Sequence, residues 1–200
     1  MSTPFHFHYA KAAQAAATLL RTEPGRKMNY YRLLKLLYIA DRESLKETGR
    51  PIIGGRLVAM NRGPLHSVLY DLINGKDSEV AYWSEFFQTD PHEHELVLRR
   101  DPGNDSLCKL EIDLLNRIRE THDTEDDFDV GELTHAFQEF IKNEPGQGSS
   151  KTIPFEDLLA AVRPNDAVAI IRDAETKALF DRTFESDFLN HSALKAEVRR

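Results

Sequence analysis

The sequence has very little cysteine and no long apolar run. Cys108 is the single cysteine among 200 residues, and one thiol cannot form a disulfide within the chain, which fits a reducing compartment. No stretch approaches the ~18 consecutive apolar residues that a membrane-spanning helix needs. His6, His8 and Lys11 interrupt the apolar character of the N-terminal segment, so we expect no secretory signal there. These absences predict a cytoplasmic protein without a membrane anchor.

Signatures of catalysis and of metal binding are also missing. There is no Gly-x-Ser-x-Gly elbow, and Gly54-Gly55 precedes a predicted strand, whereas a phosphate-binding loop opens a helix. The His-x-His pairs at 6/8 and 92/94 supply two possible ligands each, but a zinc site needs a third and a fourth. The acidic run 126–129 lacks the glycine and terminal glutamate of an EF-hand. We therefore expect that the protein is not an enzyme and has no catalytic residue, no cofactor and no metal.

The net charge of −7 is concentrated in one segment. Residues 101–150 carry −9, whereas residues 1–50 carry +5. We interpret the acidic segment 123–129 as a solvated loop, with attraction of a basic protein surface as the alternative. Arg26, Lys27 and Arg32 would suit phosphate contacts, but Tyr30 between them belongs to a predicted core face. Nucleic acid is therefore not the partner that we expect.

One long helix is expected at the centre of the fold. Asn29 suits a helix N-cap and Gly49 a helix end, and between them lies YYRLLKLLYIADRESLKET. The middle of this helix is apolar nearly all round, which predicts burial on several sides. Lys35 lies among leucines, and we expect its ammonium to reach solvent at the helix edge. The charged residues after Ala40 predict that the last two turns are exposed.

Shorter elements are predicted on either side of this helix. Strands are expected over 56–60 and 95–100, and the aromatic stretch 79–88 suits either a strand or a short helix. Pro64 suits the first position of a helix over 65–73. Other helices are predicted over 9–21, about 106–121, 129–143, 155–162 and 166–180, with a Gly/Ser-rich loop at 146–150.

Together these elements predict an α+β fold that is mainly α-helical. Its helices would surround a central hydrophobic helix at about 29–48, beside a small antiparallel β-sheet. Residues 1–164 are expected to form one domain, with 165–200 as a C-terminal helical extension that packs on the same domain. The final dozen residues are polar and are expected to fray.

Three stretches of the chain resemble the Panacea domain of the SocA-like antitoxin family, which belongs to bacterial and prophage toxin–antitoxin systems. The first, 35–73, holds a Leu-Leu-Tyr helix, a Gly-Arg-Pro exit and a Gly-Pro corner. The second is 101–118, and the third is 132–140, followed by the Gly/Ser-rich loop and Ile-Pro-Phe. The resemblance spans about 35–160. Similar proteins tend to end the third stretch with a Pro-Glu-Trp-like sequence, where this chain has Gln138-Glu139-Phe140; we expect packing to absorb that change.

The resemblance implies a non-catalytic antitoxin that neutralises a cognate protein toxin by direct protein–protein binding. Panacea domains accompany very different toxins, so the resemblance does not identify the toxin. The alternative is a proteolysis adaptor or a transcriptional autoregulator, with a protease or a second copy of the chain as a further partner.

The surface that contacts such a partner is predicted from residue types. Interfaces depend on a few aromatic or arginine anchors on rigid elements. Tyr82, Trp83, Phe86 and Phe87 place four aromatics in six residues, and we expect one pair of them to stay at the surface. Arg62 and His66 lie at a corner that Pro64 makes rigid. The predicted partner-binding residues are Arg62, His66, Tyr82 and Trp83, with the acidic loop 123–129 as the next candidate.

Overall fold

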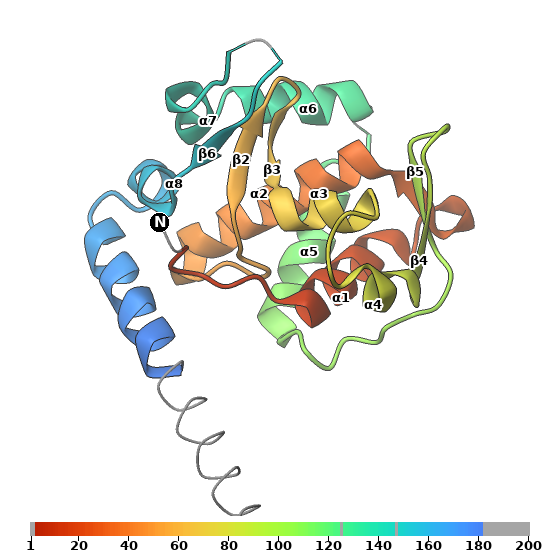
Figure 1. Ribbon diagram of the computed structural model, residues 1–200, viewed down its shortest axis with the longest axis horizontal. Coiled ribbons are helices and arrows are strands. Elements are labelled where there is room, and N and C mark those ends of the chain that lie inside the picture. The colour runs from red at the N-terminus through yellow and green to blue at the C-terminus, as the bar shows by residue number, and fades with distance from the viewer. Residues whose placement is uncertain (1–2, 125, 147, 182–200) are drawn as a thin grey trace, which may run out of the picture.

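The structure is a computed structural model that describes residues 3–124, 126–146 and 148–181. At its centre lies α2 (Tyr30–Thr48), which other elements cover on several sides (Figure 1). Oδ1 of Asn29 accepts a hydrogen bond from the Tyr31 N–H at 2.9 Å, and Gly49 ends the helix in the left-handed conformation with a φ of 75°. The predicted central helix and both of its caps are confirmed.

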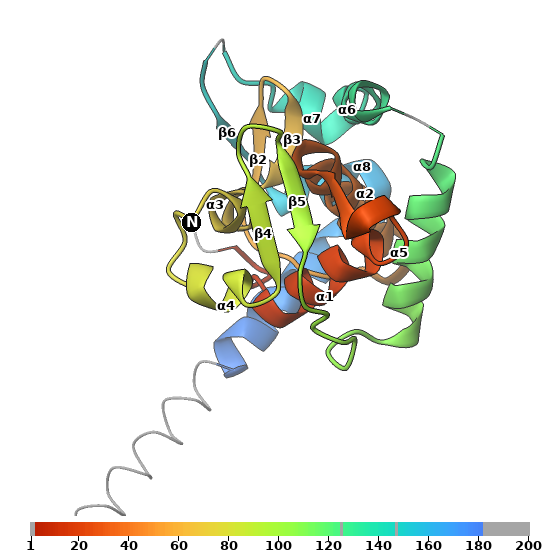
Figure 2. The same cartoon turned by 90° about the vertical axis from the view of Figure 1, so that its right-hand side faces the viewer.

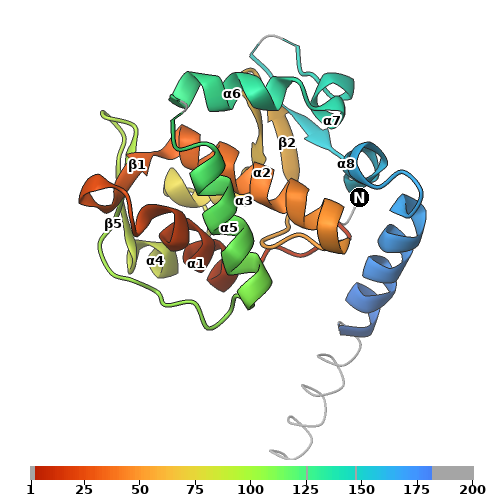
Figure 3. The same cartoon turned by 180° about the vertical axis from the view of Figure 1, so that it is seen from behind.

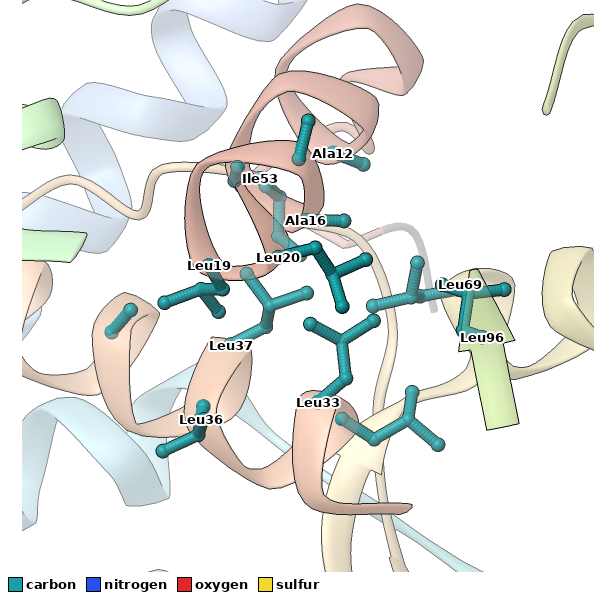
Figure 4. Close-up of a cluster of buried hydrophobic side chains, with 14 of the residues drawn as sticks. Ala12, Ala16, Leu19, Leu20, Leu33, Leu36, Leu37, Ile53, Leu69 and Leu96 are labelled. Carbon is teal, nitrogen blue, oxygen red and sulfur yellow. The ribbon is translucent and has the colours of Figure 1, made fainter. Parts of the chain in front are cut away.

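The main core lies between α2 and two further helices, α1 (Tyr9–Leu20) and α5 (Lys109–Thr121). The alanines of α1 let the two backbones approach closely, so that Leu19 and Leu20 reach Leu33 and Leu37 of α2 (Figure 4). α5 lies across α1 and α2 on the far side (Figure 3). Each leucine buried here contributes about 1.5–3 kcal/mol of transfer free energy.

The described residues form two three-stranded antiparallel sheets, where the sequence predicted one. The first has the order β1-β5-β4, from β1 (Lys27–Asn29), β4 (Phe87–Asp90) and β5 (Glu95–Leu98). The second has the order β3-β2-β6, from β2 (Leu57–Met60), β3 (Gly63–His66) and β6 (Lys151–Ile153). The predicted strands 56–60 and 95–100 therefore belong to different sheets (Figure 2).

A second, smaller core forms where β6, α7 (Gln138–Lys142) and α8 (Phe155–Val162) pack on the later turns of α2. Tyr38 and Leu45 of α2 are fully buried in it. A helix over 167–181 follows, and its Ala167 and Ile171 belong to this core. The rest of the predicted extension, 182–200, lies outside the described residues. No helix in the described ranges combines the length and the apolar character needed to cross a bilayer.

Several predicted boundaries were wrong. Residues 63–66 form β3, and helix α3 (Ser67–Ile73) begins only after them, so Pro64 is not its first residue. A proline fits there because β3 is an edge strand, where a missing N–H is tolerated. In the stretch 79–88, α4 (Val80–Ser84) precedes β4, so each alternative holds for part of it. A short 3-10 helix, η1 (Pro24–Arg26), precedes β1.

The helix predicted over 129–143 is divided in two. α6 (Asp127–His135) ends before Phe137, whose backbone is extended with a ψ of 132°, and α7 begins after it. The extended backbone at Phe137 accompanies contact of its ring with the Arg42 guanidinium, 4.2 Å from the ring centre. Three large apolar residues of these helices are exposed: Leu110 on α5, Leu133 on α6 and Ile141 on α7.

Candidate partner-binding site

The first family-like stretch folds so that its first residue, Lys35, contacts its Gly-Pro corner. Lys35 lies on α2, and its ammonium Nζ donates a hydrogen bond to the carbonyl oxygen of Pro64 on β3 at 2.8 Å. Gly63 precedes that proline with a φ of +91°, and a Cβ at this position would lie 2.7 Å from Oγ1 of Thr134 on α6. Only glycine permits both this backbone conformation and this contact. The Gly-Pro corner therefore sits tightly between α2 and α6.

Beside this corner the surface has a hollow of about 350 Å³. We call it the Lys35 hollow. Three residues from one face of α2 form one wall, and the end of β2 with the following turn forms another. The lining residues are Tyr31, Leu34, Lys35, Met60, Asn61, Arg62, Leu65, Tyr70 and 148–150. None of these described lining residues is acidic.

Lys35 is buried, which corrects the expectation that its ammonium reaches solvent. Its exposed fraction is 3%, and burial lowers its pKa to about 7. Among the described residues, the Pro64 carbonyl is the one hydrogen-bond acceptor that its ammonium has, and no carboxylate lies within ion-pair distance. An ammonium has three N–H donors, so two are left without a protein acceptor.

Arg62 stands at the rim of the hollow, as a residue on the surface. Its guanidinium lies 4.9 Å from the ring centre of Tyr31, a cation–π contact worth roughly 0.5–1 kcal/mol at an exposed site. Tyr31 in turn packs against Tyr30, with 4.6 Å between ring centres, and the Tyr30 hydroxyl oxygen lies 2.9 Å from Nδ1 of His94. The arginine is therefore held on an ordered aromatic surface.

His66, another predicted contact residue, is fully buried. Its Nδ1–H donates to the Gly54 carbonyl at 3.0 Å, and its Nε2 lies 3.6 Å from Oδ2 of Asp41. Asp41 is 2% exposed and Leu45 is buried, whereas 46–48 are exposed, so the prediction that the last two turns of α2 face solvent holds only for the final turn. Its carboxylate accepts hydrogen bonds from the backbone N–H groups of Ile52, Ile53 and Gly54 at 2.8–3.0 Å.

Burial shifts both members of this pair toward their neutral forms. It raises the pKa of Asp41, with His66 and the three backbone N–H groups acting in the opposite direction. It lowers the pKa of His66, which keeps the imidazole neutral near pH 7. The pair holds the 52–54 loop against α2, and a partner cannot reach the His66 side chain in this conformation.

The aromatic stretch after residue 80 also lies mostly inside. Trp83 is 2% exposed and stacks on Phe87 with 4.2 Å between ring centres. Tyr82 is half-buried and meets Phe86 edge-on at 5.2 Å. These are the pairings expected for a helix, but both phenylalanines are buried, so neither pair remains at the surface as an anchor.

The four predicted contact residues do not form one surface. Arg62 lies in the turn between β2 and β3, whereas Tyr82 lies on α4, and these elements lie well apart in all three views (Figures 1, 2 and 3). Arg62 lines the Lys35 hollow, and Tyr82 does not. Sequence reasoning passed over Lys35 and Asp41 as candidates, although a lysine with leucines at 33, 34, 36 and 37 was a usable indication of burial.

The end of the third stretch is structural. Glu139 is buried and accepts from Nε of Arg42 at 2.8 Å and from the Tyr38 hydroxyl at 3.3 Å. Phe140 is 4% exposed and stacks on His135 at 4.8 Å. The ring of Phe140 thus fills a packed position at the point where this chain departs from the family pattern.

The His-x-His pairs have separate surroundings. His92 and His94 are exposed in the β4–β5 turn, where His94 contacts Tyr30. Within the described parts of the chain, no three His, Cys, Asp or Glu side chains are grouped closely enough to hold a metal ion.

The fold defines a class of protein: a mainly helical α+β domain in which α2 and the β2–β3 turn border a surface hollow. A family model described as "Antitoxin SocA-like, Panacea domain" matches residues 33–140, more than half of the chain. The chain belongs to this family, as its resemblance to the Panacea domain predicted. The match ends before the Gly/Ser-rich loop and Ile153-Pro154-Phe155, which the resemblance had included. No curated protein and no solved structure matches the chain.

Proposed function

We propose that this protein is an antitoxin that neutralises a cognate protein toxin by direct contact, with the toxin encoded beside it in a bacterial or prophage module. The observation that carries the proposal is the family match over 33–140. The proposed activity is binding without catalysis, because the sequence lacks the signatures of the common catalytic classes. The proposed location is the cytoplasm.

Charge pairing argues against nucleic acid as the partner. Three basic residues of the N-terminal third lie within ion-pair distance of carboxylates. The pairs are Arg26 with Asp101 at 3.7 Å, Lys27 with Glu95 at 2.8 Å, and Arg32 with Asp127 at 3.9 Å. Phosphate contacts would have to compete with these carboxylates, which lowers the affinity that a basic surface supplies.

We place the toxin contact at the Lys35 hollow and its rim. Arg62 combines exposure with an ordered position on Tyr31, and arginine and tyrosine are enriched among residues that dominate interface energies. Tyr82, His66 and Trp83 lie elsewhere or inside, so Arg62 is the predicted contact residue that we retain.

Co-expression tests the function. The adjacent open reading frame would be induced alone and together with this chain, and growth would be measured. We expect arrest with the neighbour alone, restored growth with both proteins, and co-purification of the two. Growth arrest that this chain does not relieve would contradict the proposal.

The chain offers a matched control for the contact site. Arg100 is also exposed and also lies 4.9 Å from an aromatic ring centre, that of Phe86, but it follows β5 and is outside the hollow. Arg62→Ala is expected to abolish rescue, whereas Arg100→Ala is expected to preserve it, with both variants expressed at equal levels. Equal rescue by the two variants would show that the toxin does not contact Arg62 at the hollow. The acidic segment 123–129 would then be tested.

A further inference from the structure

The Lys35 hollow contains a cation whose hydrogen-bonding capacity the protein leaves largely unused. Lys35 is only 3% exposed, yet its ammonium has a single protein acceptor among the described residues, the Pro64 carbonyl at 2.8 Å. A buried charge is costly unless it is paired and hydrogen-bonded. Because Lys35 lines the hollow, its two remaining N–H donors are the groups there for which an added acceptor would gain most.

A second cation stands at the entrance. Arg62 lies on Tyr31, and within the described residues it has neither an ion pair nor a side-chain hydrogen bond. Asn61, Ser149 and Ser150 add neutral donors along the same lining, which contains no described carboxylate. The hollow is therefore positively charged when Lys35 is protonated, and no described lining residue carries a compensating negative charge.

The rest of the lining is apolar and aromatic. Leu34, Leu65 and Met60 line the hollow together with the rings of Tyr31 and Tyr70. An occupant that matches both parts carries a carboxylate next to an apolar or aromatic side chain. A nucleic-acid phosphate would match the charge but not this apolar lining.

We propose that the Lys35 hollow binds an acidic anchor, an aspartate or glutamate side chain that a partner protein presents beside an aromatic residue. The carboxylate would pair with Lys35 and Arg62, and the neighbouring ring would lie on Tyr31 and Tyr70. This inference deepens the proposed function, on which it rests for the nature of the partner, and it assigns the chemistry that the partner must supply.

A peptide experiment tests the anchor without any toxin. The ¹⁵N-labelled full chain at pH 7 would be titrated to millimolar concentration with a short peptide, capped at both ends, that has aspartate between two phenylalanines. A matched peptide with asparagine is the control for charge. We expect saturable shifts of backbone signals at Tyr31, Lys35 and Arg62, and roughly ten- to hundredfold weaker binding of the asparagine peptide, as expected for loss of a charge-assisted hydrogen bond.

Variants distinguish the hollow from a general basic surface. Arg62→Ala and Lys35→Met should each weaken binding of the aspartate peptide, whereas Arg100→Ala should not. The backbone spectrum shows whether Lys35→Met is folded; if it is not, Arg62→Ala against Arg100→Ala carries the comparison. Equal binding of both peptides, shifts away from the hollow, no shifts at all, or binding only of a peptide with a free C-terminal carboxylate would each overturn the proposal.

The outcome is independent of the co-expression result. Specific binding of the aspartate peptide combined with failed rescue would leave the acidic-anchor site standing and remove the antitoxin function. Successful rescue combined with no peptide binding at the hollow would leave the antitoxin function standing and remove this site.

Discussion

Asp41 and Lys35 are two buried charges on the same helix, six residues apart, and the protein treats them differently. The Asp41 carboxylate accepts three backbone N–H groups at 2.8–3.0 Å and has His66 nearby. The Lys35 ammonium has one carbonyl acceptor, at 2.8 Å, and lies at a hollow. The hydrogen bonds of the Asp41 carboxylate are made within the fold, whereas two N–H donors of the Lys35 ammonium have no acceptor among the described residues.

The difference separates a structural role for Asp41 from the binding role that we propose for Lys35. Three N–H donors around a carboxylate fix the 52–54 loop, which leads into β2, so Asp41 is needed to position the strand that borders the hollow. One carbonyl stabilises a buried ammonium less than three N–H groups stabilise a buried carboxylate. The low pKa of Lys35, about 7, reflects this incomplete solvation. The fold thus satisfies the hydrogen-bonding capacity of Asp41 and leaves that of Lys35 incomplete.

A third charge placed between these two should have the largest effect. Leu37 is 1% exposed in the core that α1 and α2 share. Leu37→Asp would bury a carboxylate that has neither three N–H groups nor a hollow, at a cost of several kcal/mol against a total stability of ~5–15 kcal/mol. We expect no cooperative thermal transition by circular dichroism. A melt within a few degrees of the wild type would show that α2 is not central.

Removal of the enclosed charge should come next. Asp41→Ala leaves three buried N–H groups without their acceptor, and each such group costs about 1–3 kcal/mol. We expect a stability loss of several kcal/mol in urea unfolding. Asp41→Asn keeps one acceptor oxygen and should lose less; equal losses for the two variants would mean that the three hydrogen bonds are not what matters.

Removal of the Lys35 charge should have an effect on stability that depends on pH, because the cost of burying the ammonium is greatest near and below pH 7 and falls as pH rises. Because the pKa of Lys35 is about 7 in the folded chain and has the ordinary lysine value of 10.5 in the unfolded chain, the unfolded chain binds more protons between these values. The wild type should therefore gain stability relative to Lys35→Met as pH rises from 7 toward 10. Unfolding curves of both proteins at several pH values measure this difference. A constant difference across that range would contradict incomplete solvation of Lys35.

The smallest effect on stability is expected for Arg62. Its contact with Tyr31 is exposed and worth roughly 0.5–1 kcal/mol, similar to that of Arg100 with Phe86. Because Arg100 also makes an exposed ion pair with Glu85, Arg62→Ala should lower the melting temperature by a small amount that is no larger than the loss for Arg100→Ala. A much larger loss for Arg62→Ala would mean that it supports the fold, and loss of rescue could then not be assigned to contact with a partner.

The sequence predicted the helices well where local chemistry decides them. Asn29 and Gly49 bound α2 as expected, and the family resemblance followed from residues whose spacing is visible in one dimension. Prediction from the sequence failed where residues distant in the sequence determine the local structure. Pro64 became part of a strand because β2 pairs with it through Ala59, and α6 ends where Phe137 turns its ring to Arg42.

Burial of polar residues was the least predictable feature of the site. His66 and Asp41 are polar residues that the sequence suggests are exposed, but the 52–54 loop covers them. Trp83 was predicted as a surface anchor, but it stacks on Phe87 and is buried. Lys35 was assigned to the helix edge because lysines usually extend to water. The hollow joins α2 to the end of β2, to α3 and to residues 148–150, and no local pattern contains that combination.

The most direct test of the difference between the two charges is the titration of the Lys35 amine itself. Protein with ¹⁵N-labelled lysine side chains, assigned by comparison with Lys35→Met, would be followed by NMR from pH 5 to pH 11. We predict a Lys35 midpoint near 7, well below that of the exposed lysines. A midpoint near 10.5 would contradict this prediction, because the ammonium would then be solvated as fully as a surface lysine and the hollow would hold no unsatisfied charge.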